Sequence, residues 1–386
     1  FLINHLKELS KKNSKPLVIR IGSYPTIQRP GQGLAVSKLM AIEKFETKLI
    51  SYKNNEDYIL DHKVESKVFF FKFPNPTMPK SRKGLIFYLL QVKRLWAILY
   101  FSYKAIRVIS IKRPDILHVH SPLHFLIIQW ARQRNIETFL TFHGTDFVRI
   151  KGSLVYRFLL TGIQNICCVS GLNRDELKNI FPDASINLVS NGVDADEFLT
   201  VSDYNTDNTV VAVGTLRWHK GFDKLIIMFS SIVKIHPEWV LKIIGDGPDK
   251  ELLQQLITSL DLQRNVVLMG AMGRDKLTRE LSRAKIFALS SVTEGLPKVL
   301  LEAMCAKSAC VSFDVGDCAR VLGNCGLLIK PDDSDSFIQA IISLINDTSM
   351  QRQLSVFAES RAKEFSWNKY LDLHQTLYQQ ALLNRK

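Results

Sequence analysis

The sequence lacks long apolar runs, paired cysteine motifs and clusters of metal ligands. No stretch of about 18 consecutive apolar residues is present, so we predict no transmembrane helix. The first residues lack the apolar core and cleavage site of a signal peptide, and they lack an initiator Met, so we expect a fragment or processed chain. The cysteines form no Cys-x2-Cys pair: they are Cys167, Cys168, Cys305, Cys310, Cys318 and Cys325. We therefore expect reduced core thiols, no bound metal and a cytoplasmic location.

The chain is long, and its charge is unevenly distributed. Its 386 residues suffice for two domains, each with its own core. The net charge is +14, and residues 1–200 hold 29 Lys and Arg against 16 Asp and Glu, so the second half is nearly neutral. A basic first half suits an anionic partner, for which a phospholipid surface, a lipid-phosphate acceptor and nucleic acid are the candidates.

Short apolar segments alternate with helix-like segments, which predicts parallel α/β architecture. In the first half we predict strands at Leu17–Ile21, Asp115–His120, Thr138–Phe142, Asn165–Ser170 and Ile186–Val189. In the second half we predict strands at Val210–Gly214, Val240–Gly245, Val266–Gly270, Ile286–Leu289 and Ala309–Phe313. The polar stretch Ser202–Asn208 is the expected linker. We predict two doubly wound, Rossmann-like domains, residues 1–200 and 201–365, that face a ligand-binding cleft, with residues 366–386 as a terminal helix.

The stretch that follows Ile286–Leu289 carries the strongest chemical signal. Glu294 lies in the loop between this strand and a predicted helix at Val299–Ala306, and Glu302 lies within that helix. Such a loop is at the carboxyl end of a parallel strand, where α/β proteins bind ligands. A carboxylate there can accept hydrogen bonds from sugar hydroxyls. The alternative is a solvated loop glutamate followed by an ordinary helix glutamate.

The residues just after Glu294 strengthen the functional interpretation. Gly295 and Leu296 offer backbone N–H groups to hydroxyl or anionic oxygens, and Pro297 suits the first turn of a helix because it has no N–H to satisfy. Glu294 and Glu302, with Gly-Leu-Pro between them, resemble the Glu-x7-Glu motif of the retaining glycosyltransferases of family GT4, which have the GT-B fold. The resemblance runs in order from about residue 17 to residue 383, and it implies that the terminal helix, residues 366–386, crosses back to the N-terminal domain.

The resemblance implies transfer of a sugar from a nucleotide diphosphate sugar, the donor. Glu294 would hold hydroxyls of the donor sugar, and Glu302 would hold the ribose of the nucleotide. It also implies retention of the anomeric configuration, chemistry without a divalent metal, and no cofactor besides the donor substrate.

A basic turn follows the first predicted strand of the second half. Lys220 and Arg217 can neutralise a pyrophosphate, Lys as a point charge and Arg through two parallel hydrogen bonds. The alternative is a basic surface loop. Lys220 and Gly221 match the phosphate turn of the GT4 family, but Thr215 stands where the family has Arg. We therefore expect Lys220 to be a catalytic group and Arg217 to assist in donor binding.

Three further positions resemble family landmarks. His143, followed by Gly144, ends a predicted strand, and the resemblance implies that it orients the donor near the reacting carbon; the alternative is a structural imidazole. Gly31 and Gly33 resemble a glycine-rich loop beside the donor diphosphate, although two glycines before a helix are often only a turn. Gly270 ends a strand beside the expected nucleobase pocket.

A basic and aromatic segment stands out in the first half. Its basic residues fall within an arc of about 140° on a helix: Arg82, Lys83, Lys93, Arg94, Lys104, Arg107 and Lys112. The interleaved aromatic residues are Phe87, Trp96, Tyr100, Phe101 and Tyr103. The segment is either a solvated helix face or a patch that meets an anionic membrane.

We predict a hexosyltransferase-type enzyme that transfers a sugar to a glycan or lipid-linked acceptor. Its pathway would be the synthesis of cell-surface polysaccharide, lipopolysaccharide or glycolipid, at the inner face of the plasma membrane. The alternatives are a GT-B-fold nucleotide-sugar epimerase or phosphorylase, and a non-catalytic basic binder of membrane or nucleic acid. The acidic motif and the phosphate turn lie in the nearly neutral half, which argues against the basic binder, and we expect no nucleic acid partner.

Overall fold

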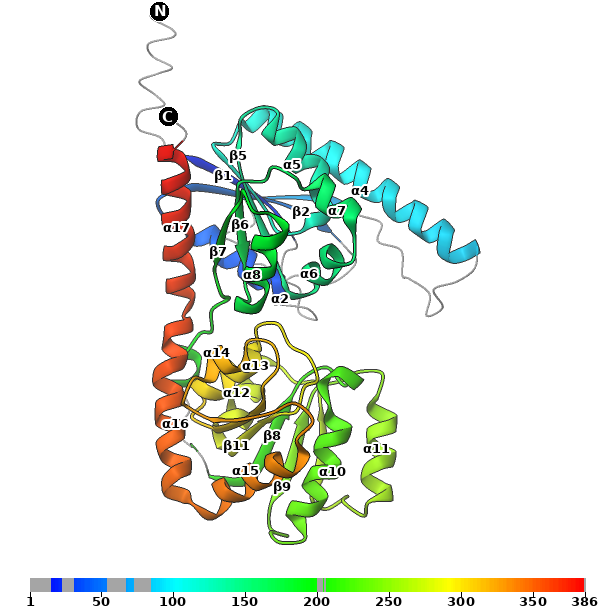
Figure 1. Ribbon diagram of the computed structural model, residues 1–386, viewed down its shortest axis with the longest axis vertical. Coiled ribbons are helices and arrows are strands. Elements are labelled where there is room, and N and C mark those ends of the chain that lie inside the picture. The colour runs from blue at the N-terminus through cyan, green and yellow to red at the C-terminus, as the bar shows by residue number, and fades with distance from the viewer. Residues whose placement is uncertain are drawn as a thin grey trace, which may run out of the picture. The chain divides into compact units, whose positions relative to one another are not determined.

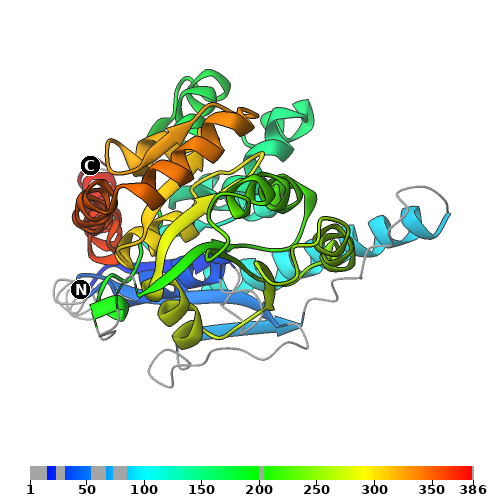
Figure 2. The same cartoon turned by 90° about the horizontal axis from the view of Figure 1, so that it is seen from below.

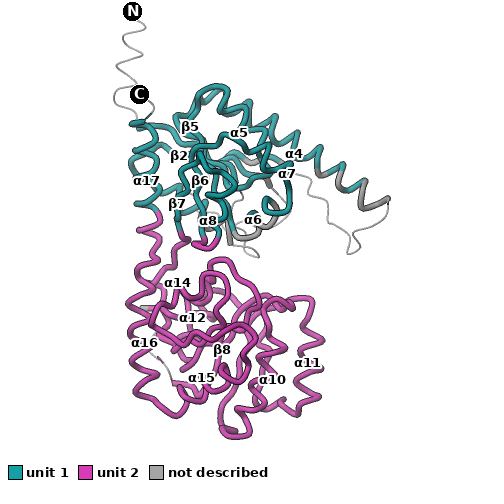
Figure 3. The backbone as a smooth tube through the Cα atoms, viewed as in Figure 1, with its two compact units in different colours: residues 1–169, 173–189, 371–386 teal, residues 170–172, 190–370 magenta. Residues whose placement is uncertain are grey.

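The computed structural model describes residues 15–22, 31–53, 67–72, 85–199, 204 and 206–384 (Figure 1). The chain forms two compact units, which Figure 3 distinguishes by colour. Unit 1 comprises residues 1–169, 173–189 and 371–386, and unit 2 comprises residues 170–172 and 190–370. Each unit contains one parallel β-sheet with helices between its strands, which confirms the predicted α/β class.

The sheet of unit 1 has seven strands in the order β3-β2-β1-β4-β5-β6-β7. Their bounds are β1 (Leu17–Ile21), β2 (Glu46–Lys53), β3 (Val68–Lys72), β4 (Ile116–Val119), β5 (Glu137–Phe142), β6 (Asn165–Cys168) and β7 (Ser185–Leu188). Chain order reverses between β1 and β4, so the sheet is doubly wound and its topological switch point lies between these two strands. Apolar residues of both strands, among them Ile19 and Leu117, are fully buried in the core of the unit.

The helices up to residue 180 include one that is much longer than the others. Their bounds are α2 (Gly31–Lys38), η1 (Leu39–Ala41), α4 (Leu85–Lys112), η2 (Pro122–His124), α5 (Phe125–Arg132), α6 (Gly144–Lys151), α7 (Leu154–Leu159) and α8 (Gly171–Ile180). The N-terminal part of α4 extends away from the sheet of unit 1 in both views (Figure 1 and Figure 2). None of the helices in the described part of the chain is long and apolar enough to cross a membrane.

The sheet of unit 2 has six strands in the order β10-β9-β8-β11-β12-β13. Their bounds are β8 (Asp207–Val213), β9 (Val240–Ile244), β10 (Val266–Gly270), β11 (Ala284–Leu289), β12 (Ala309–Phe313) and β13 (Leu327–Ile329). Here the switch point lies between β8 and β11, which pair in parallel with Phe287 opposite Val211. The loops that leave β8 and β11 are therefore the expected ligand-binding loops of this unit.

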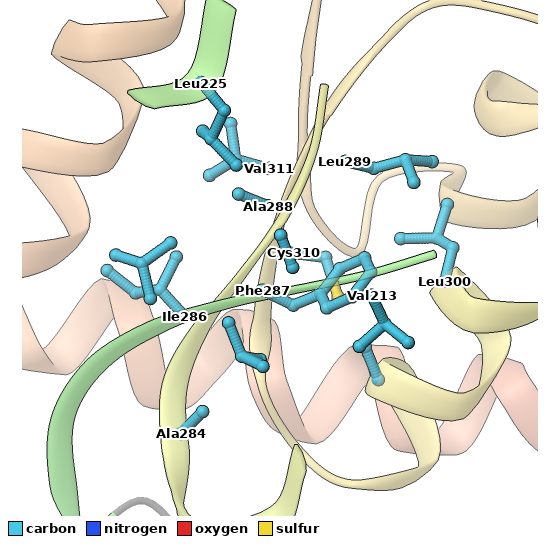
Figure 4. Packing of buried hydrophobic residues seen from close by; sticks show 14 of the residues in the cluster. Val213, Leu225, Ala284, Ile286, Phe287, Ala288, Leu289, Leu300, Cys310 and Val311 are labelled. Atoms are coloured by element: carbon cyan, nitrogen blue, oxygen red, sulfur yellow. The ribbon is translucent and has the colours of Figure 1, made fainter. Parts of the chain in front are cut away.

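Helices cover this second sheet and bury its central strands. From residue 196 onward the helices are α9 (Asp196–Leu199), η3 (Trp218–Lys220), α10 (Phe222–Val233), α11 (Lys250–Ser259), α12 (Arg274–Arg283), α13 (Lys298–Cys305), α14 (Cys318–Leu322), α15 (Ser334–Asn346), α16 (Thr348–Ala362), η4 (Lys363–Phe365) and α17 (Trp367–Asn384). Figure 4 shows Phe287 of β11 among Cys310 of β12, Leu300 of α13 and Val213 of β8, all of which are buried. Burial on both faces explains the unbroken apolar run of β11.

The boundary between the units falls earlier than the predicted boundary at residue 200. Residues 190–200 belong to unit 2, because Val193 and Phe198 join its core and the Val193 N–H donates to the Phe365 carbonyl (2.8 Å). Of the predicted linker, Asp207 and Asn208 already belong to β8. The linker residues 202, 203 and 205 lie outside the described part of the chain.

The last helix, α17, begins in unit 2 and ends in unit 1. Within unit 1 the ring of Tyr378 makes edge contacts with Phe45 and Phe139, at centroid distances of 5.5 and 5.1 Å. Its hydroxyl is hydrogen-bonded to Nδ1 of His118 (2.5 Å). The part of α17 around Tyr378 therefore packs into unit 1.

Candidate active site

The segment after β8 turns sharply toward the end of β11. Gly221 has a φ of 63°, and a Cβ at this position would lie 2.2 Å from the Ser290 carbonyl oxygen. Only glycine tolerates both the left-handed backbone and this close approach. The Ser290 hydroxyl donates to the Lys220 carbonyl (3.0 Å), and the Val292 N–H donates to the His219 carbonyl (2.9 Å). These contacts join the two loops at the switch point of the sheet.

Lys220 and Glu294 form an ion pair across this junction. Lys220 Nζ lies 2.6 Å from Glu294 Oε1, and the Ser291 hydroxyl donates to the same oxygen (2.7 Å). The side chains of Lys220 and Glu294 are 18% and 10% exposed. Within the described chain no residue donates to Oε2 of Glu294, so this oxygen can accept a hydrogen bond from a ligand. The structure thus brings together Lys220 and Glu294, which the sequence predicted as site residues in separate loops.

The loop after β12 fixes the backbone around Glu294. Gly316 has a φ of 59°, and a Cβ there would lie 2.4 Å from the Glu294 carbonyl oxygen. The Asp317 N–H donates to the Gly295 carbonyl (3.0 Å). No described residue accepts a hydrogen bond from the N–H groups of Gly295 or Leu296. These two donors lie just before the N-terminus of α13, where an anionic oxygen is favoured.

The sequence placed Pro297 in the first turn of the helix, whereas the structure makes it the N-cap of α13. This difference of one position is within the usual uncertainty of helix ends, and the missing N–H of proline costs nothing at either place.

Glu302 forms an ion pair that the sequence did not reveal. Its Oε1 lies 2.5 Å from Nη1 of Arg274, and Nε of Arg274 lies 2.5 Å from Oε2 of Glu197. The guanidinium also lies over the ring of Phe198, 5.7 Å from its centroid. Burial is the largest single influence and lowers the pKa of Arg274, but Glu302 and Glu197 together outweigh it and raise this pKa. Arg274 therefore holds the Glu302 carboxylate in one place.

The other predicted donor-site residues of unit 2 lie at the same edge of its sheet. Arg217 is exposed and has an extended backbone just before η3. Gly270 ends β10 with a φ of 72°, a Cβ there would meet nothing within 4 Å, and its carbonyl accepts from the Gly245 N–H (2.9 Å). The carboxyl ends of β8, β10 and β11 therefore carry Arg217, Lys220, Glu294 and Gly270.

His143 follows β5 at the carboxyl edge of the other sheet, in unit 1. It is 8% exposed, its N–H donates to Oδ2 of Asp146 (3.4 Å), and its carbonyl accepts from the Asp146 N–H (2.8 Å). The ring of His120, just after β4, lies 5.9 Å away by centroid. Burial, and next the nearby His143, lower the pKa of His120 well below its ordinary value. Sequence reasoning missed His120, although the His-x-His pattern of this strand was a signal.

Gly31 and Gly33 lie in the first turn of α2, so the prediction of a loop at these positions was wrong. The preceding residues 23–30 lie outside the described part of the chain. Gly31–Lys38 contains no residue that breaks a helix, and its two glycines only weaken the first turn. The participation of these glycines and of His143 in one donor site with Glu294 stays a prediction.

Within the described residues, one group in unit 1 has the spacing of metal ligands. His118, Cys167 and His374 are buried, and their ligand atoms lie within 4.8 Å of one another. Both ring nitrogens of His118 are already hydrogen-bonded, to Tyr378 (2.5 Å) and to Thr141 (2.7 Å). Burial raises the pKa of the Cys167 thiol to about 12, which disfavours the thiolate that a metal needs. We therefore assign no metal to this cluster.

The fold is that of a doubly wound α/β protein, and the Lys220–Glu294 ion pair lies at the switch point of its second sheet. Two family profiles match adjoining parts of the chain: Glycosyltransferase Family 4 matches residues 58–197, and Glycosyl transferases group 1 matches residues 197–361. Together they span most of the chain. The protein belongs to this family of glycosyltransferases, GT4.

Curated relatives are about one-quarter identical to this chain over the aligned residues. The gpi3 subunit of phosphatidylinositol N-acetylglucosaminyltransferase from Schizosaccharomyces pombe is 26% identical over 265 residues, which cover 66% of this chain and 58% of that protein. N-acetyl-alpha-D-glucosaminyl L-malate synthase from Bacillus anthracis is 25% identical over 294 residues, 70% of this chain and 76% of that protein. An uncharacterized glycosyltransferase from Haemophilus influenzae is 28% identical over 169 residues, 43% and 47% of the two chains. The chain spans about half the length of the first and third of these relatives.

Solved structures match nearly the whole chain at low identity. Sucrose-phosphate synthase from Thermosynechococcus elongatus has a TM-score of 0.76 at 18% identity, covering 96% of this chain and 100% of that one. Anabaena HepE in complex with UDP and glucose has a TM-score of 0.72 at 15% identity, covering 94% and 99%. These likenesses confirm the predicted two-domain GT-B fold.

Proposed function

We propose that the protein transfers a sugar from a nucleotide diphosphate sugar to a glycan or lipid-linked acceptor. The observation that carries the proposal is the Lys220–Glu294 pair at the switch point of the unit 2 sheet. A cation and a carboxylate in contact, both mostly buried, match the two chemical halves of such a donor. The cation suits the diphosphate, and the carboxylate suits the sugar hydroxyls.

Donor binding would exchange partners within this pair. The diphosphate carries more negative charge than one carboxylate, so its oxygens attract Lys220, with the exposed Arg217 adding a second cation. The sugar hydroxyls then donate to Glu294, whose Oε2 receives no other hydrogen bond within the described chain. Positive charge placed where the leaving diphosphate gains negative charge lowers the barrier to transfer.

The nucleoside half of the donor would lie toward α13 and β10. Glu302 would accept from the ribose hydroxyls while Arg274 fixes its orientation, and the backbone around Gly270 would contact the base. We also propose that His143 orients the donor near the reacting carbon and that backbone near Gly31 and Gly33 contacts the diphosphate. With Lys220 and Arg217 as the cations, we propose transfer without a divalent metal and with retention of configuration.

A lipid-linked acceptor is supported by two observations. One relative is named for a phosphatidylinositol substrate, and residues 1–200 hold nearly all of the excess positive charge. We propose that this basic half meets an anionic lipid surface at the inner face of the plasma membrane. Synthesis of cell-surface polysaccharide, lipopolysaccharide or glycolipid would use such an arrangement.

A matched pair of lysine variants tests the donor site. Lys220→Met removes the ion pair with Glu294. Lys224→Met, on α10 of the same unit, removes an exposed ion pair with Asp332. We expect Lys220→Met to abolish transfer from every nucleotide sugar that the wild type uses, while Lys224→Met keeps it. Equal activity of the two variants would refute the assignment. Retained activity in EDTA, and product anomers resolved by NMR, test the metal and stereochemical parts.

A further inference from the structure

Helix α4 carries a line of exposed apolar side chains, which we call the ridge. The ridge consists of Leu89, Val92, Trp96, Leu99 and Tyr103, with exposed fractions of 53%, 52%, 68%, 38% and 56%. Their spacing alternates between three and four residues, so they form one continuous stripe along the helix. A single exposed apolar residue is ordinary, but a contiguous stripe marks a surface that another molecule covers.

The opposite face of the same helix is also apolar. Ala97, Phe101, Ala105 and Ile109 recur every four residues and are no more than 4% exposed. The Phe101 ring packs against Phe71, at a centroid distance of 6.2 Å. One face of the helix therefore packs against unit 1, and the other face carries the ridge. The outer face of a helix that meets only solvent is normally polar.

Cations border the ridge along α4. Lys93 and Arg107 are exposed, and the sequence of α4 contains no Asp or Glu in its 28 residues. Lys104 Nζ lies 5.5 Å from the centroid of the Tyr100 ring, and the Arg107 guanidinium lies 5.9 Å from that of Tyr103. Aromatic rings with cations beside them are typical of side chains at a membrane interface. Of the predicted basic arc, Arg82 and Lys83 lie outside the described residues.

We infer that the ridge inserts into the surface of an anionic phospholipid bilayer. Trp96, Leu99 and Tyr103 would enter the boundary between headgroups and acyl chains, and Lys104 and Arg107 would bind lipid phosphates. Charge decides against a second copy of the chain as the occupant, because two α4 helices would bring like charges together with no acid to offset them. Membrane binding by the ridge does not depend on the proposed function. Only its purpose, bringing the enzyme to a lipid-linked acceptor, rests on that function.

Three double variants separate the apolar and electrostatic contributions. The ridge variant combines Trp96→Ser with Leu99→Ser. The charge variant combines Lys104→Gln with Arg107→Gln. The control variant combines Leu252→Ser with Phe357→Ser, two residues of unit 2 that are 65% and 49% exposed. All six positions lie outside the cores, so unchanged unfolding temperatures would show that the variants are folded.

Sedimentation with phosphatidylcholine vesicles containing about one-third phosphatidylglycerol measures the binding. We expect the wild type to bind at low salt and to retain part of its binding at about 0.5 M salt, since screening leaves apolar insertion intact. The ridge variant should bind at least about tenfold more weakly at both salt concentrations. The charge variant should lose mainly the salt-sensitive part, and the control variant should bind like the wild type.

Other results would overturn the inference. Absence of wild-type binding at low salt, equal binding by the ridge variant, or complete release of the wild type by salt would each contradict apolar insertion. A wild-type dimer that the ridge variant converts to a monomer would show that a second copy covers the ridge. Nucleoside diphosphate binding, measured separately by thermal shift, should be the same in the ridge variant and the wild type. If vesicle binding follows the expectation but no nucleotide binds, the proposed transferase function fails and the membrane surface stands.

Discussion

The Lys220–Glu294 ion pair can be tested in the ligand-free protein by a double-mutant cycle. Lys220→Met and Glu294→Gln each remove one charge, and the double variant removes both. The two side chains are 18% and 10% exposed, so each single variant leaves the other group with little water to replace its partner. The cycle isolates the coupling between them from any separate effect of each substitution.

The expected magnitude follows from this burial. Breaking a fully buried pair by removing one partner costs about 3–5 kcal/mol, and since some solvent reaches both groups we expect about 2 kcal/mol for each single variant. For a unit of this size, that corresponds to a fall in the unfolding temperature of roughly 4–8 °C. The double variant should be destabilised by only about 1 kcal/mol, which is about 3 kcal/mol less than the sum of the singles, because it leaves no unpaired charge.

Urea and thermal unfolding of the four proteins measure the stability cycle, and nucleotide-sugar transfer measures activity. Stability should be partly restored in the double variant, whereas activity should be lost in all three variants. Single variants as stable as the wild type, with additive effects and retained transfer, would refute both the ion pair and its role. Recovery of stability without recovery of activity would show that the pair serves the donor as well as the fold.

Three further predictions concern the surroundings of the site and the core of unit 1. Gly221→Ala should cost at least about 2 kcal/mol in urea unfolding, since its φ is 63°, whereas Gly273→Ala, with open space around it, should be nearly neutral. Arg274→Met should weaken nucleoside diphosphate binding about tenfold in calorimetry by freeing Glu302, and unchanged affinity would contradict this role. Burial lowers the pKa of His124 from 6.5 to about 4, so the unfolded state takes up the proton first. Stability should therefore fall as pH drops from about 6.5 to 4, by up to about 1.4 kcal/mol per pH unit, and His124→Leu should flatten this dependence in urea unfolding at several pH values.

The sequence predicts the parts of the site that depend on local patterns. The apolar run of β11, the loop with Glu294 and the helix with Glu302 are adjacent along the chain, and each has a characteristic composition. Lys220 was found because Gly221 follows it in a strand-to-helix turn. Since parallel strands place such loops at one edge of the sheet, the proximity of Lys220 and Glu294 followed from topology.

The parts that were missed depend on packing between distant segments. Arg274 lies 28 positions from Glu302 and 77 from Glu197, and no motif joins these residues. The need for glycine at position 316 arises only because the loop after β12 crosses the backbone of Glu294. Similarly, the helical arc separates basic from apolar positions of α4 but does not show which side packs against the protein. The sequence therefore could not predict that Phe101 is buried and Trp96 is exposed.

We propose that Lys220 and Glu294 bind the diphosphate and the sugar of one donor. Thermal-shift titration of the wild type and the Glu294→Gln variant with a panel of nucleotide sugars and their nucleoside diphosphates tests it most directly. We predict that one nucleotide sugar stabilises the wild type saturably. The variant should still bind the nucleoside diphosphate through Lys220 but should lose the added stabilisation from the sugar. Absence of stabilisation by any nucleotide sugar, or identical titrations for the two proteins, would contradict the claim.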